Sequence, residues 1–376
     1  MKLKVLFLVN IPAPYRIDFF NELGKYCDLT VLIESKSAEH RNNTWLQKKS
    51  INFNSIYLTP TKILNKTICL DVSEHLNNDY DIYVIGVYNT PTSIIAMRKL
   101  NRLHKKFIIS VDGGYIKDDN LLKKWIKTKL LSGAAYWLSP SSESDKYLSY
   151  YGADINRIRR YNFTSVLSDD LISVDEITPA IKERLREQLG ITEKKVILSI
   201  GRFSYNKGYG KGYDILMRLA ERMPSDVGIY IVGDDPTEEF IEWKEKKQLK
   251  HVHFIGFKSK AEIANYYKAA NLFVLLTRGD VWGLVINEAM CYCLPVITSD
   301  KCIAGIELVH NEENGYIVSL NNENTIFDRI MNIVNDPERE GKMAINNYKR
   351  IKEYTIEKMA LQHITVFNKI NEQNLK

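Results

Sequence analysis

The sequence predicts an α/β protein built from two doubly wound domains with parallel sheets. Short apolar runs alternate with segments of helical spacing, and this alternation stops near residue 165 and starts again near residue 191. The chain has 376 residues, of which 45% are hydrophobic and 26% are charged. That composition is typical of a globular protein with a sizeable core, and it excludes a disordered, collagen-like or coiled-coil chain.

The first domain is predicted over residues 1–165. Its strands are apolar runs of five or six residues that are bounded by turn or polar residues: Lys4–Val9, Leu29–Ile33, Ile82–Gly86 and Phe107–Val111. Ligands of open α/β sheets bind at the carboxyl edge of the strands. The residues that follow each strand are therefore the first candidates for function.

Residues 166–190 are predicted to be a linker and an entry helix, since the first part is acidic and without periodicity and the last part has helical spacing. The second domain is predicted over residues 191–350. Its strands are Lys195–Ile200, Val227–Val232, His251–Ile255, Leu272–Leu276 and Pro295–Thr298. Residues 351–376 are predicted to form a last helix with an apolar stripe.

Positive charge is concentrated in the first domain. Residues 1–165 hold 24 Lys and Arg against 15 Asp and Glu, whereas the rest of the chain holds 28 against 31. This imbalance favours anionic partners such as phosphates or an acidic membrane surface. Nucleic acid is not expected as a partner, because no recognised nucleic-acid-binding motif accompanies the charge.

Hydropathy and cysteine content indicate a cytoplasmic location. No apolar run approaches the ~18 residues of a membrane-spanning helix, and the run Val5–Val9 is too short for a signal peptide. The five cysteines are an odd number without a secretion signal. We therefore expect buried free thiols, with neither disulfides nor a metal site.

Two glycine-containing motifs follow the strand Lys195–Ile200. Gly201-Arg202-Phe203 places an arginine at the sheet edge, where it could bind a phosphate through two hydrogen bonds. Lys207-Gly208 and Lys211-Gly212 come next in a glycine-rich run. This run is not a Walker motif, and a flexible loop is as good an interpretation as a phosphate-binding loop.

The most informative run extends from Asp280 to Met290, after the strand Leu272–Leu276. A helix is predicted from Gly283 onward, and its first N–H groups would bind an anion at the sheet edge. Asp280 and Glu288 could accept hydrogen bonds from sugar or ribose hydroxyls. The alternative is that Asp280 only caps the helix and Glu288 is a solvated charge.

Two further features lie in the first domain. Asp112 follows the strand Phe107–Val111 and precedes two glycines, so it either reaches into an interdomain cleft or forms a plain turn. A basic amphipathic helix is predicted over residues 121–131, with Lys123, Lys124 and Trp125 among its residues. It either packs its apolar face on the sheet or docks on an anionic membrane.

Together these motifs resemble glycosyltransferase family 4, a family of retaining nucleotide-sugar-dependent enzymes with the GT-B fold. The resemblance rests on an ordered set in the second domain: Gly201-Arg-Phe203 with a following Lys-Gly, Val232-Gly-Asp234, Phe254-Ile-Gly256, Asp280, Glu288-Ala-Met290, Leu294-Pro-Val-Ile297 and Asn314-Gly315. The opening Asn10–Arg16 with Phe19-Phe20 is similar to a first-domain loop of bacterial surface-polysaccharide members.

The resemblance implies two Rossmann-like domains that face each other across a cleft, with the last helix crossing back to the first domain. It implies roles for several residues. Donor diphosphate binding falls to Arg202, Lys207 or Lys211, and the amides of Gly283 and Leu284, and nucleoside binding falls to Glu288, Gly256 and Phe257. The similar first-domain loop assigns Pro14, Tyr15 and Arg16 to the acceptor or membrane side, to which the basic amphipathic helix adds Lys123, Lys124 and Trp125. Asp280 would contact hydroxyls of the donor sugar.

This sequence departs from the family pattern at three places. Asp280 replaces the first glutamate of the family motif, and Lys207 and Lys211 compete as the phosphate-binding lysine. Asp112 stands where the family has a catalytic-site histidine, so Asp112, Asp280 and Glu288 are the candidate catalytic residues.

The implied activity is metal-independent, retaining transfer of a sugar from a nucleoside diphosphate sugar, most often a UDP sugar, without a further cofactor. The implied acceptor is a lipid-linked glycan in capsule or O-antigen (lipopolysaccharide) biosynthesis, at the inner face of the plasma membrane. Two alternatives remain open: a GT-B-fold nucleotide-sugar epimerase and a catalytically silent GT-B partner subunit.

Overall fold

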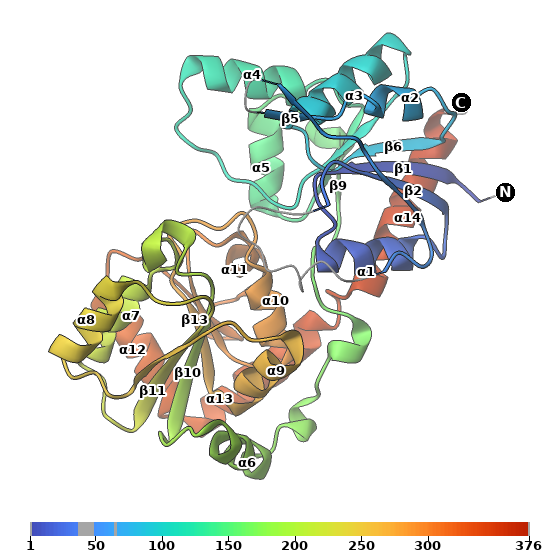
Figure 1. Ribbon diagram of the computed structural model, residues 1–376. Coiled ribbons are helices and arrows are strands. Elements are labelled where there is room, and N and C mark those ends of the chain that lie inside the picture. Colours follow the sequence, from blue (N-terminus) through green and yellow to red (C-terminus); the bar gives the residue numbers. More distant parts are fainter. Residues whose placement is uncertain (1, 37–48, 64–65, 375–376) are drawn as a thin grey trace. The chain divides into compact units, whose positions relative to one another are not determined.

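The computed structural model describes residues 2–36, 49–63 and 66–374, and its contacts divide the chain into two compact units (Figure 1). The first unit comprises Met1–Leu167 and Tyr354–Lys376, and the second unit comprises Ser168–Glu353. The first unit is therefore built from both ends of the chain.

The first unit contains a seven-stranded parallel sheet in the order β3-β2-β1-β6-β7-β8-β9. Its strands are β1 (Lys4–Val9), β2 (Asp28–Ile33), β3 (Asn54–Tyr57), β6 (Ile82–Ile85), β7 (Ile108–Ser110), β8 (Tyr136–Ser139) and β9 (Ile158–Arg160). A separate antiparallel pair consists of β4 (Thr61–Ile63) and β5 (Lys66–Ile68). The strand order reverses between β1 and β6, and such a reversal leaves a crevice at the carboxyl edge.

Helices cover both faces of this sheet. They are α1 (Pro14–Leu23), α2 (Val72–His75), α3 (Pro91–Arg102), α4 (Leu121–Leu131), α5 (Ser142–Tyr150), the 3-10 turn η2 (Ile155–Arg157) and α14 (Ile356–Asn374). The C-terminal helix α14 packs on α1. Aromatic rings join the two helices to the sheet, since Phe7 of β1 contacts Phe19 and Phe20 of α1 and Phe367 of α14 at centroid distances of 5.2–6.2 Å.

The second unit repeats the architecture with a six-stranded parallel sheet in the order β12-β11-β10-β13-β14-β15. Its strands are β10 (Lys195–Ile200), β11 (Val227–Val232), β12 (Val252–Ile255), β13 (Leu272–Leu275), β14 (Val296–Ser299) and β15 (Gly315–Val318). The order reverses between β10 and β13, so the residues after these two strands meet at one crevice.

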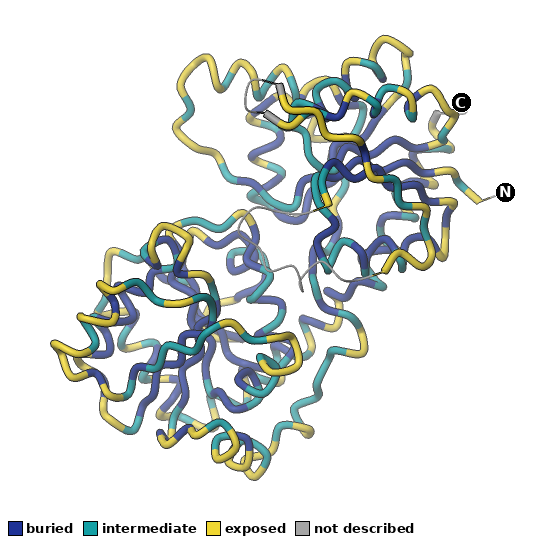
Figure 2. The backbone as a smooth tube through the Cα atoms, viewed as in Figure 1, coloured by how far each residue is buried: buried dark blue, intermediate teal, exposed yellow. Residues whose placement is uncertain are grey.

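The helices of the second unit alternate with its strands. They are η3 (Ser168–Asp170), η4 (Val174–Glu176), α6 (Pro179–Leu189), η5 (Tyr205–Lys211), α7 (Tyr213–Ala220), α8 (Glu238–Lys246), α9 (Lys260–Ala269), α10 (Leu284–Cys291), α11 (Ile303–Leu308), α12 (Glu323–Val334) and α13 (Pro337–Ile351). Figure 2 shows that the strands of both sheets are mostly buried, whereas the outer helices are exposed along one side. That contrast is the pattern of a sheet sandwiched between helical layers.

Every predicted strand is present. Three match to the residue (β1, β10 and β11), and the others differ by one or two residues at their ends. Four strands of the two main sheets were not predicted: β3, β8, β9 and β15. These strands have only three or four residues, and three of them lie at sheet edges, so they lack the apolar run that marks a central strand.

The connection after residue 167 belongs to the second unit. The thiol of Cys291 donates a hydrogen bond to the carbonyl of Asp170 at 2.7 Å, and the N–H of Ile172 donates to the carbonyl of Cys291 at 3.2 Å. All five cysteines are buried free thiols, which confirms that expectation: Cys27, Cys69, Cys291, Cys293 and Cys302. Cys291 thus joins the connecting segment to the end of α10.

Candidate active site

A lysine–aspartate pair lies at the carboxyl edge of the second sheet, where the strand order reverses. Lys211 ends the irregular segment η5 after β10, and Asp280 lies between β13 and α10. Their side chains form an ion pair of 2.6 Å between Lys211 Nζ and Asp280 Oδ2, with exposed fractions of only 16% and 20%. The fold therefore brings together two residues that the sequence analysis had listed for different parts of a donor.

The start of α10 adjoins this pair. Gly283 has a φ of +100°, and a Cβ at this position would lie 2.6 Å from Cys302 Sγ, so a side chain does not fit here. The helix begins at the next residue, Leu284, and its first N–H groups have no partners within the helix. Asp280 Oδ1 accepts the N–H of Trp282 at 3.3 Å. The carboxylate and the helix N-terminus thus lie on one stretch of backbone, and the Lys211 cation reaches this carboxylate from η5.

Glu288 lies in the second turn of α10. Its Oε2 accepts a hydrogen bond from the hydroxyl of Tyr267 at 3.1 Å. Tyr267 is buried and stacks on Tyr292 with a centroid distance of 5.0 Å and an interplanar angle of 7°. Burial, helped by the charge of Glu288, raises the pKa of Tyr267 well above its ordinary value, so the hydroxyl remains a donor. Glu288 is therefore oriented by a partner and is not a freely solvated charge.

The Gly-Arg-Phe turn after β10 is held by Asp234. This carboxylate accepts the N–H groups of Phe203 and of Ser204 (3.1 Å), and Phe203 is buried. The side chain of Arg202, which directly precedes Phe203, is exposed and makes no ion pair with any other residue that the structure describes. The backbone position of Arg202 is therefore set, while its guanidinium remains available to a ligand.

The two competing lysines differ in their surroundings. Lys207 is exposed and has a φ of +51° within a run of three left-handed residues, whereas Lys211 points at Asp280. This contrast favours Lys211 as the residue that faces a donor. The sequence indicated this preference through the segment Lys211-Gly-Tyr-Asp214, which leads directly into the helix α7.

Gly256 and Phe257 follow the edge strand β12, at the same edge of the sheet as Arg202. Phe257 is 58% exposed. Neither residue contacts the Lys211–Asp280 pair. Their assignment to a nucleoside stays a prediction.

The first unit has an ion pair of its own. Arg16 NH2 lies 2.6 Å from Asp112 Oδ2, and the hydroxyl of Tyr15 donates to the same oxygen at 3.0 Å. Arg16 also donates to Asn10 Oδ1 at 3.1 Å. Burial is the largest single influence and would lower the pKa of Arg16, but the charges and hydrogen bonds of Asp112 and Tyr15 together outweigh burial and raise it. Asp112 and the neighbouring loop, which were listed under separate roles, form one cluster.

A small cavity of about 30 Å³ adjoins this cluster. It is lined by Asp112, Tyr15, Arg16, Gly86 and, from α14, His363 together with several aromatic rings. This volume holds one or two waters. Pro14 begins α1, where its fixed φ suits the first helical position. Asn10 is the first residue of the Asn10–Arg16 loop but was given no role of its own, and His363 was not singled out from the sequence, because it is not next to a recognisable motif.

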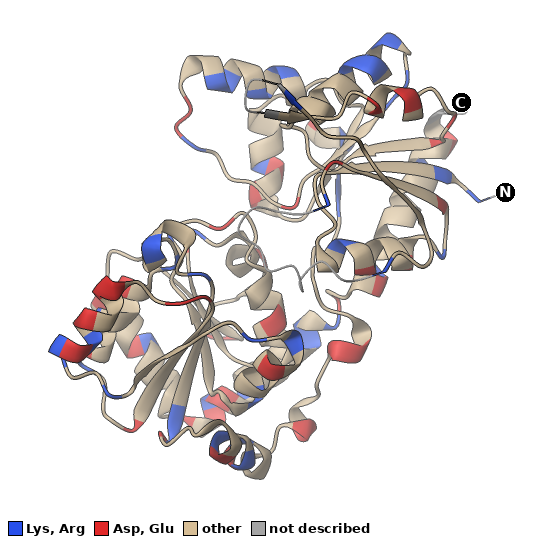
Figure 3. Ribbon diagram, in the orientation of Figure 1, with Lys and Arg blue, Asp and Glu red and all other residues tan. Residues whose placement is uncertain are grey.

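The helix α4 matches its predicted bounds, but the proposal that it packs its apolar face on the sheet is wrong. Leu121, Leu122 and Trp125 are 86%, 66% and 62% exposed. The opposite side faces α5 instead: the ammonium of Lys124 lies 4.1 Å from the ring centre of Tyr150, and that of Lys127 lies 5.9 Å from the ring centre of Tyr147. Exposed apolar residues of α4 thus accompany the exposed Lys123. Figure 3 shows that basic residues recur along this helix.

Within the described residues, no helix is both long and apolar enough to cross a membrane.

Comparisons with known proteins identify a family match in the second unit and similar folds among solved structures. Residues 181–350 match the family model described as Glycosyl transferases group 1. An uncharacterized glycosyltransferase from Methanocaldococcus jannaschii is 24% identical over 224 residues, which cover 56% of this chain and 63% of the relative. The alpha-monoglucosyldiacylglycerol synthase of Acholeplasma laidlawii is 25% identical over 197 residues, covering 52% and 48%. The chain thus spans less than two thirds of the length of either relative.

Solved structures are similar over nearly the whole chain. HepE from Anabaena, solved in complex with UDP, has a TM-score of 0.76 at 18% identity and covers 99% of both chains. WaaG, a glycosyltransferase involved in lipopolysaccharide biosynthesis, has a TM-score of 0.66 at 14% identity and covers 96% of this chain and 99% of its own. This chain therefore has the GT-B fold with two Rossmann-like domains, and its second unit carries the match to the glycosyl transferases of group 1.

Proposed function

We propose that the protein is a retaining, family 4 glycosyltransferase that moves a sugar from a nucleoside diphosphate sugar to a glycan acceptor. The observation that carries the proposal is the Lys211–Asp280 pair beside the N-terminus of α10, with Glu288 further along the same helix. In support, HepE was solved with UDP and with UDP-glucose. A UDP sugar is therefore our first choice of donor.

The chemistry follows from the charges at this edge. When the bond between sugar and diphosphate breaks, negative charge develops on the leaving phosphate. Lys211, the guanidinium of Arg202 and the N–H groups at Gly283 and Leu284 would stabilise that charge without a metal. Asp280 would accept hydrogen bonds from sugar hydroxyls and Glu288 from the ribose. In the first unit Asp112 would act by holding Arg16 rather than by taking a proton, because two donors already occupy one of its oxygens.

A nucleotide panel tests this proposal. Melting temperatures would be measured with UDP, GDP, dTDP and their common sugars, with and without EDTA. A ligand that binds only the folded state raises the melting temperature. We expect one nucleotide family to stabilise the protein equally with and without EDTA. The effect should be lost in Glu288→Ala and kept in Glu338→Ala, a matched change at an exposed glutamate of α13.

Product analysis then separates the alternatives. Release of free sugar or transfer with an unchanged anomeric configuration supports a retaining transferase. A change in the configuration of the donor sugar without transfer would instead show an epimerase. Tight nucleotide binding without any turnover would show a catalytically silent partner subunit, and no binding to any nucleotide would overturn the proposal.

We further propose that the acceptor is a lipid-linked glycan of bacterial surface polysaccharide, and that the first unit meets an anionic membrane at the inner face of the plasma membrane. The support is the exposed side of α4, where Trp125 and two leucines lie beside Lys123 and Lys129. Apolar side chains that insert at the headgroup level, with basic residues around them, are typical of interfacial helices. The names of the Acholeplasma synthase and of WaaG are consistent with such an acceptor.

Vesicle sedimentation tests the membrane proposal. We expect binding to vesicles with phosphatidylglycerol and little binding to pure phosphatidylcholine. Leu121→Ser with Trp125→Ser should abolish binding. The matched change Leu361→Ser with Ile345→Ser, at exposed apolar residues of α14 and α13, should leave it intact. Equal binding by both double variants would refute a role for α4.

A further inference from the structure

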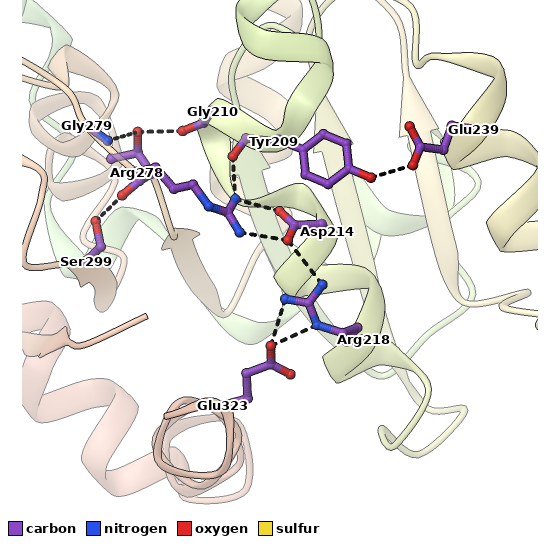
Figure 4. Close-up of polar contacts among 10 residues, drawn as sticks. Tyr209, Gly210, Asp214, Arg218, Glu239, Arg278, Gly279, Ser299 and Glu323 are labelled. Carbon is purple, nitrogen blue, oxygen red and sulfur yellow. Dashed lines mark hydrogen bonds and ion pairs between the residues drawn. The ribbon is translucent and has the colours of Figure 1, made fainter. Parts of the chain in front are cut away.

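Four charged side chains form a continuous chain of ion pairs in the second unit (Figure 4). Arg278 contacts both oxygens of Asp214 at 2.7 and 2.8 Å. Arg218 reaches the same carboxylate at 3.1 Å and Glu323 of α12 at 2.7 Å. Sequence reasoning assigned none of these residues a role.

The segment that carries Lys211 needs support from outside. Asn206, Lys207 and Gly208 have left-handed backbone angles, so η5 is interrupted and lacks a continuous set of helical hydrogen bonds. Its last carbonyls are bound by residues after β13. The carbonyl of Gly210 accepts the N–H of Arg278 at 2.9 Å and the hydroxyl of Thr277 at 3.0 Å.

Arg278 takes part both in the chain of ion pairs and in the contacts to η5. Its guanidinium donates to the carbonyl of Tyr209 as well as to Asp214, and its own backbone lies two residues before Asp280. One side chain therefore connects the backbone just before Lys211 to the loop that bears Asp280.

Asp214 holds that guanidinium in place. The side chain of Asp214 is only 4% exposed. Burial alone would raise the pKa of Asp214, but hydrogen bonds from Arg278 and Arg218 outweigh burial and lower it. The carboxylate thus stays charged, and its two-point contact fixes the plane of the Arg278 guanidinium.

We propose that Arg278, oriented by Asp214, is a positioning residue that sets where Lys211 lies relative to Asp280 and so determines affinity for the diphosphate of the donor. This inference rests on the proposed function, since it takes Lys211 as the phosphate-binding lysine. It predicts an effect on the phosphates rather than on the nucleoside, because Arg278 contacts the segment that carries Lys211, whereas Glu288 accepts a hydrogen bond from Tyr267 of α9.

Calorimetric binding of UDP and UMP to Arg278→Met and Arg218→Met tests the inference. Both variants remove one of the two arginines that contact Asp214, but only Arg278 also donates to the carbonyl of Tyr209, two residues before Lys211. We expect Arg278→Met to weaken UDP binding about tenfold, the loss of one charge-assisted contact, and UMP binding by less than about twofold. Arg218→Met should change neither by more than about twofold, and Arg278→Lys should be intermediate.

The outcomes are distinct. Equal loss of UDP and UMP affinity in Arg278→Met, or equal loss in both variants, would mean that the charged chain is only structural. If Arg278→Met does not fold, the double variant Arg278→Met with Asp214→Asn, which leaves no unpaired buried carboxylate, gives the same comparison. If the wild type binds GDP or dTDP instead, the corresponding mono- and diphosphates are used. A wild type that binds no nucleoside diphosphate overturns the proposed function itself.

Discussion

Both units carry a carboxylate that follows a parallel strand and pairs with a cation at 2.6 Å, yet the two pairs have opposite surroundings. In the first unit Asp112 and Arg16 lie beside a small cavity walled by aromatic rings and α14. In the second unit Lys211 and Asp280 lie between an irregular glycine-rich segment and the N-terminus of a helix. One pair is placed by side-chain packing and the other by backbone conformation.

The difference indicates that the two units, despite their similar folds, suit different ligands. Backbone N–H groups and cations around Asp280 suit an anion, because they supply positive potential without movement. The cavity beside Asp112 has space for only one or two waters, so it leaves little space for a charged group. We therefore expect changes in the second unit to act on donor binding and changes in the first unit to act on the acceptor or on stability.

The largest expected effect comes from replacing Lys211, one of the two candidate phosphate-binding lysines, and comparing it with replacement of the other, Lys207. Lys211→Met should lower kcat/KM about 100-fold or more, the usual cost of removing a charge that stabilises the transition state. Lys207→Met should change it less than about threefold, since this lysine is exposed and unpaired among the described residues. Initial rates with saturating acceptor give both values. A larger effect of Lys207 would show that the wrong lysine was chosen.

The next effect concerns backbone placement in the second unit. Gly212 has a φ of +74°, and a Cβ there would lie 2.0 Å from the carbonyl oxygen of Leu276. Gly190 has a φ of +68° with no atom within 4 Å of such a Cβ. We expect Gly212→Ala to cost about 3 kcal/mol or more of unfolding free energy and Gly190→Ala about 1 kcal/mol. Urea denaturation measures both, and equal costs would refute the close approach.

The stability of the first unit should depend on pH through His363. Burial lowers the pKa of His363 to about 4, from 6.5 in the unfolded chain, although Asp112 and the carbonyl of Met359 oppose this shift. Because the unfolded state binds the proton more tightly, stability is lost as pH falls from 6.5 towards 4. Between pH 7 and pH 5 the loss is on the order of 2 kcal/mol.

Comparison with His363→Phe isolates this contribution. In the same unit, burial raises the pKa of Glu34 to about 7, so its contribution to stability has the opposite dependence on pH. Because Glu34 is present in both proteins, its contribution cancels in the comparison. The difference in melting temperature between wild type and His363→Phe should therefore shift against the wild type on acidification. A difference that does not change with pH would mean that His363 titrates normally.

The smallest effect tests the role of Asp112. Asp112→Asn should lower turnover about tenfold through misplacement of Arg16, with donor affinity changed less than about twofold. Asp280→Asn should instead weaken donor binding by at least as much as it lowers turnover. Steady-state kinetics in both substrates separate the two. Loss of turnover by more than about a thousandfold in Asp112→Asn would show that this carboxylate takes the proton after all.

The architecture was predictable where strands lie in the middle of a sheet. β1, β10 and β11 are buried on both faces and read as continuous apolar runs, so their bounds matched to the residue. The edge strand β9 has two arginines among its three residues, and its pairing comes from its neighbour β8 rather than from its own composition.

The site was predictable in its members but not in their pairing. Arg202 and Asp280 were found because each follows a strand, and Glu288 was found because it lies on the helix that follows Asp280. The contact between Lys211 and Asp280 depends on how η5 folds back, which is fixed by Arg278 and Asp214 from two other elements. Likewise, α4 faces outward because Lys124 and Lys127 bind tyrosines of α5, and no periodicity in α4 shows this.

The first unit is assembled from two chain segments that are far apart in the sequence, and this has a consequence for biosynthesis. The second unit is complete once residue 353 has been translated, but the first unit still lacks α14 and the ring of Phe367 against Phe7. The domain that begins the chain is therefore the last to be finished as it leaves the ribosome. Until then the aromatic side of α1 is uncovered, and a nascent chain stalled or truncated before residue 356 would be a target for chaperones and proteases.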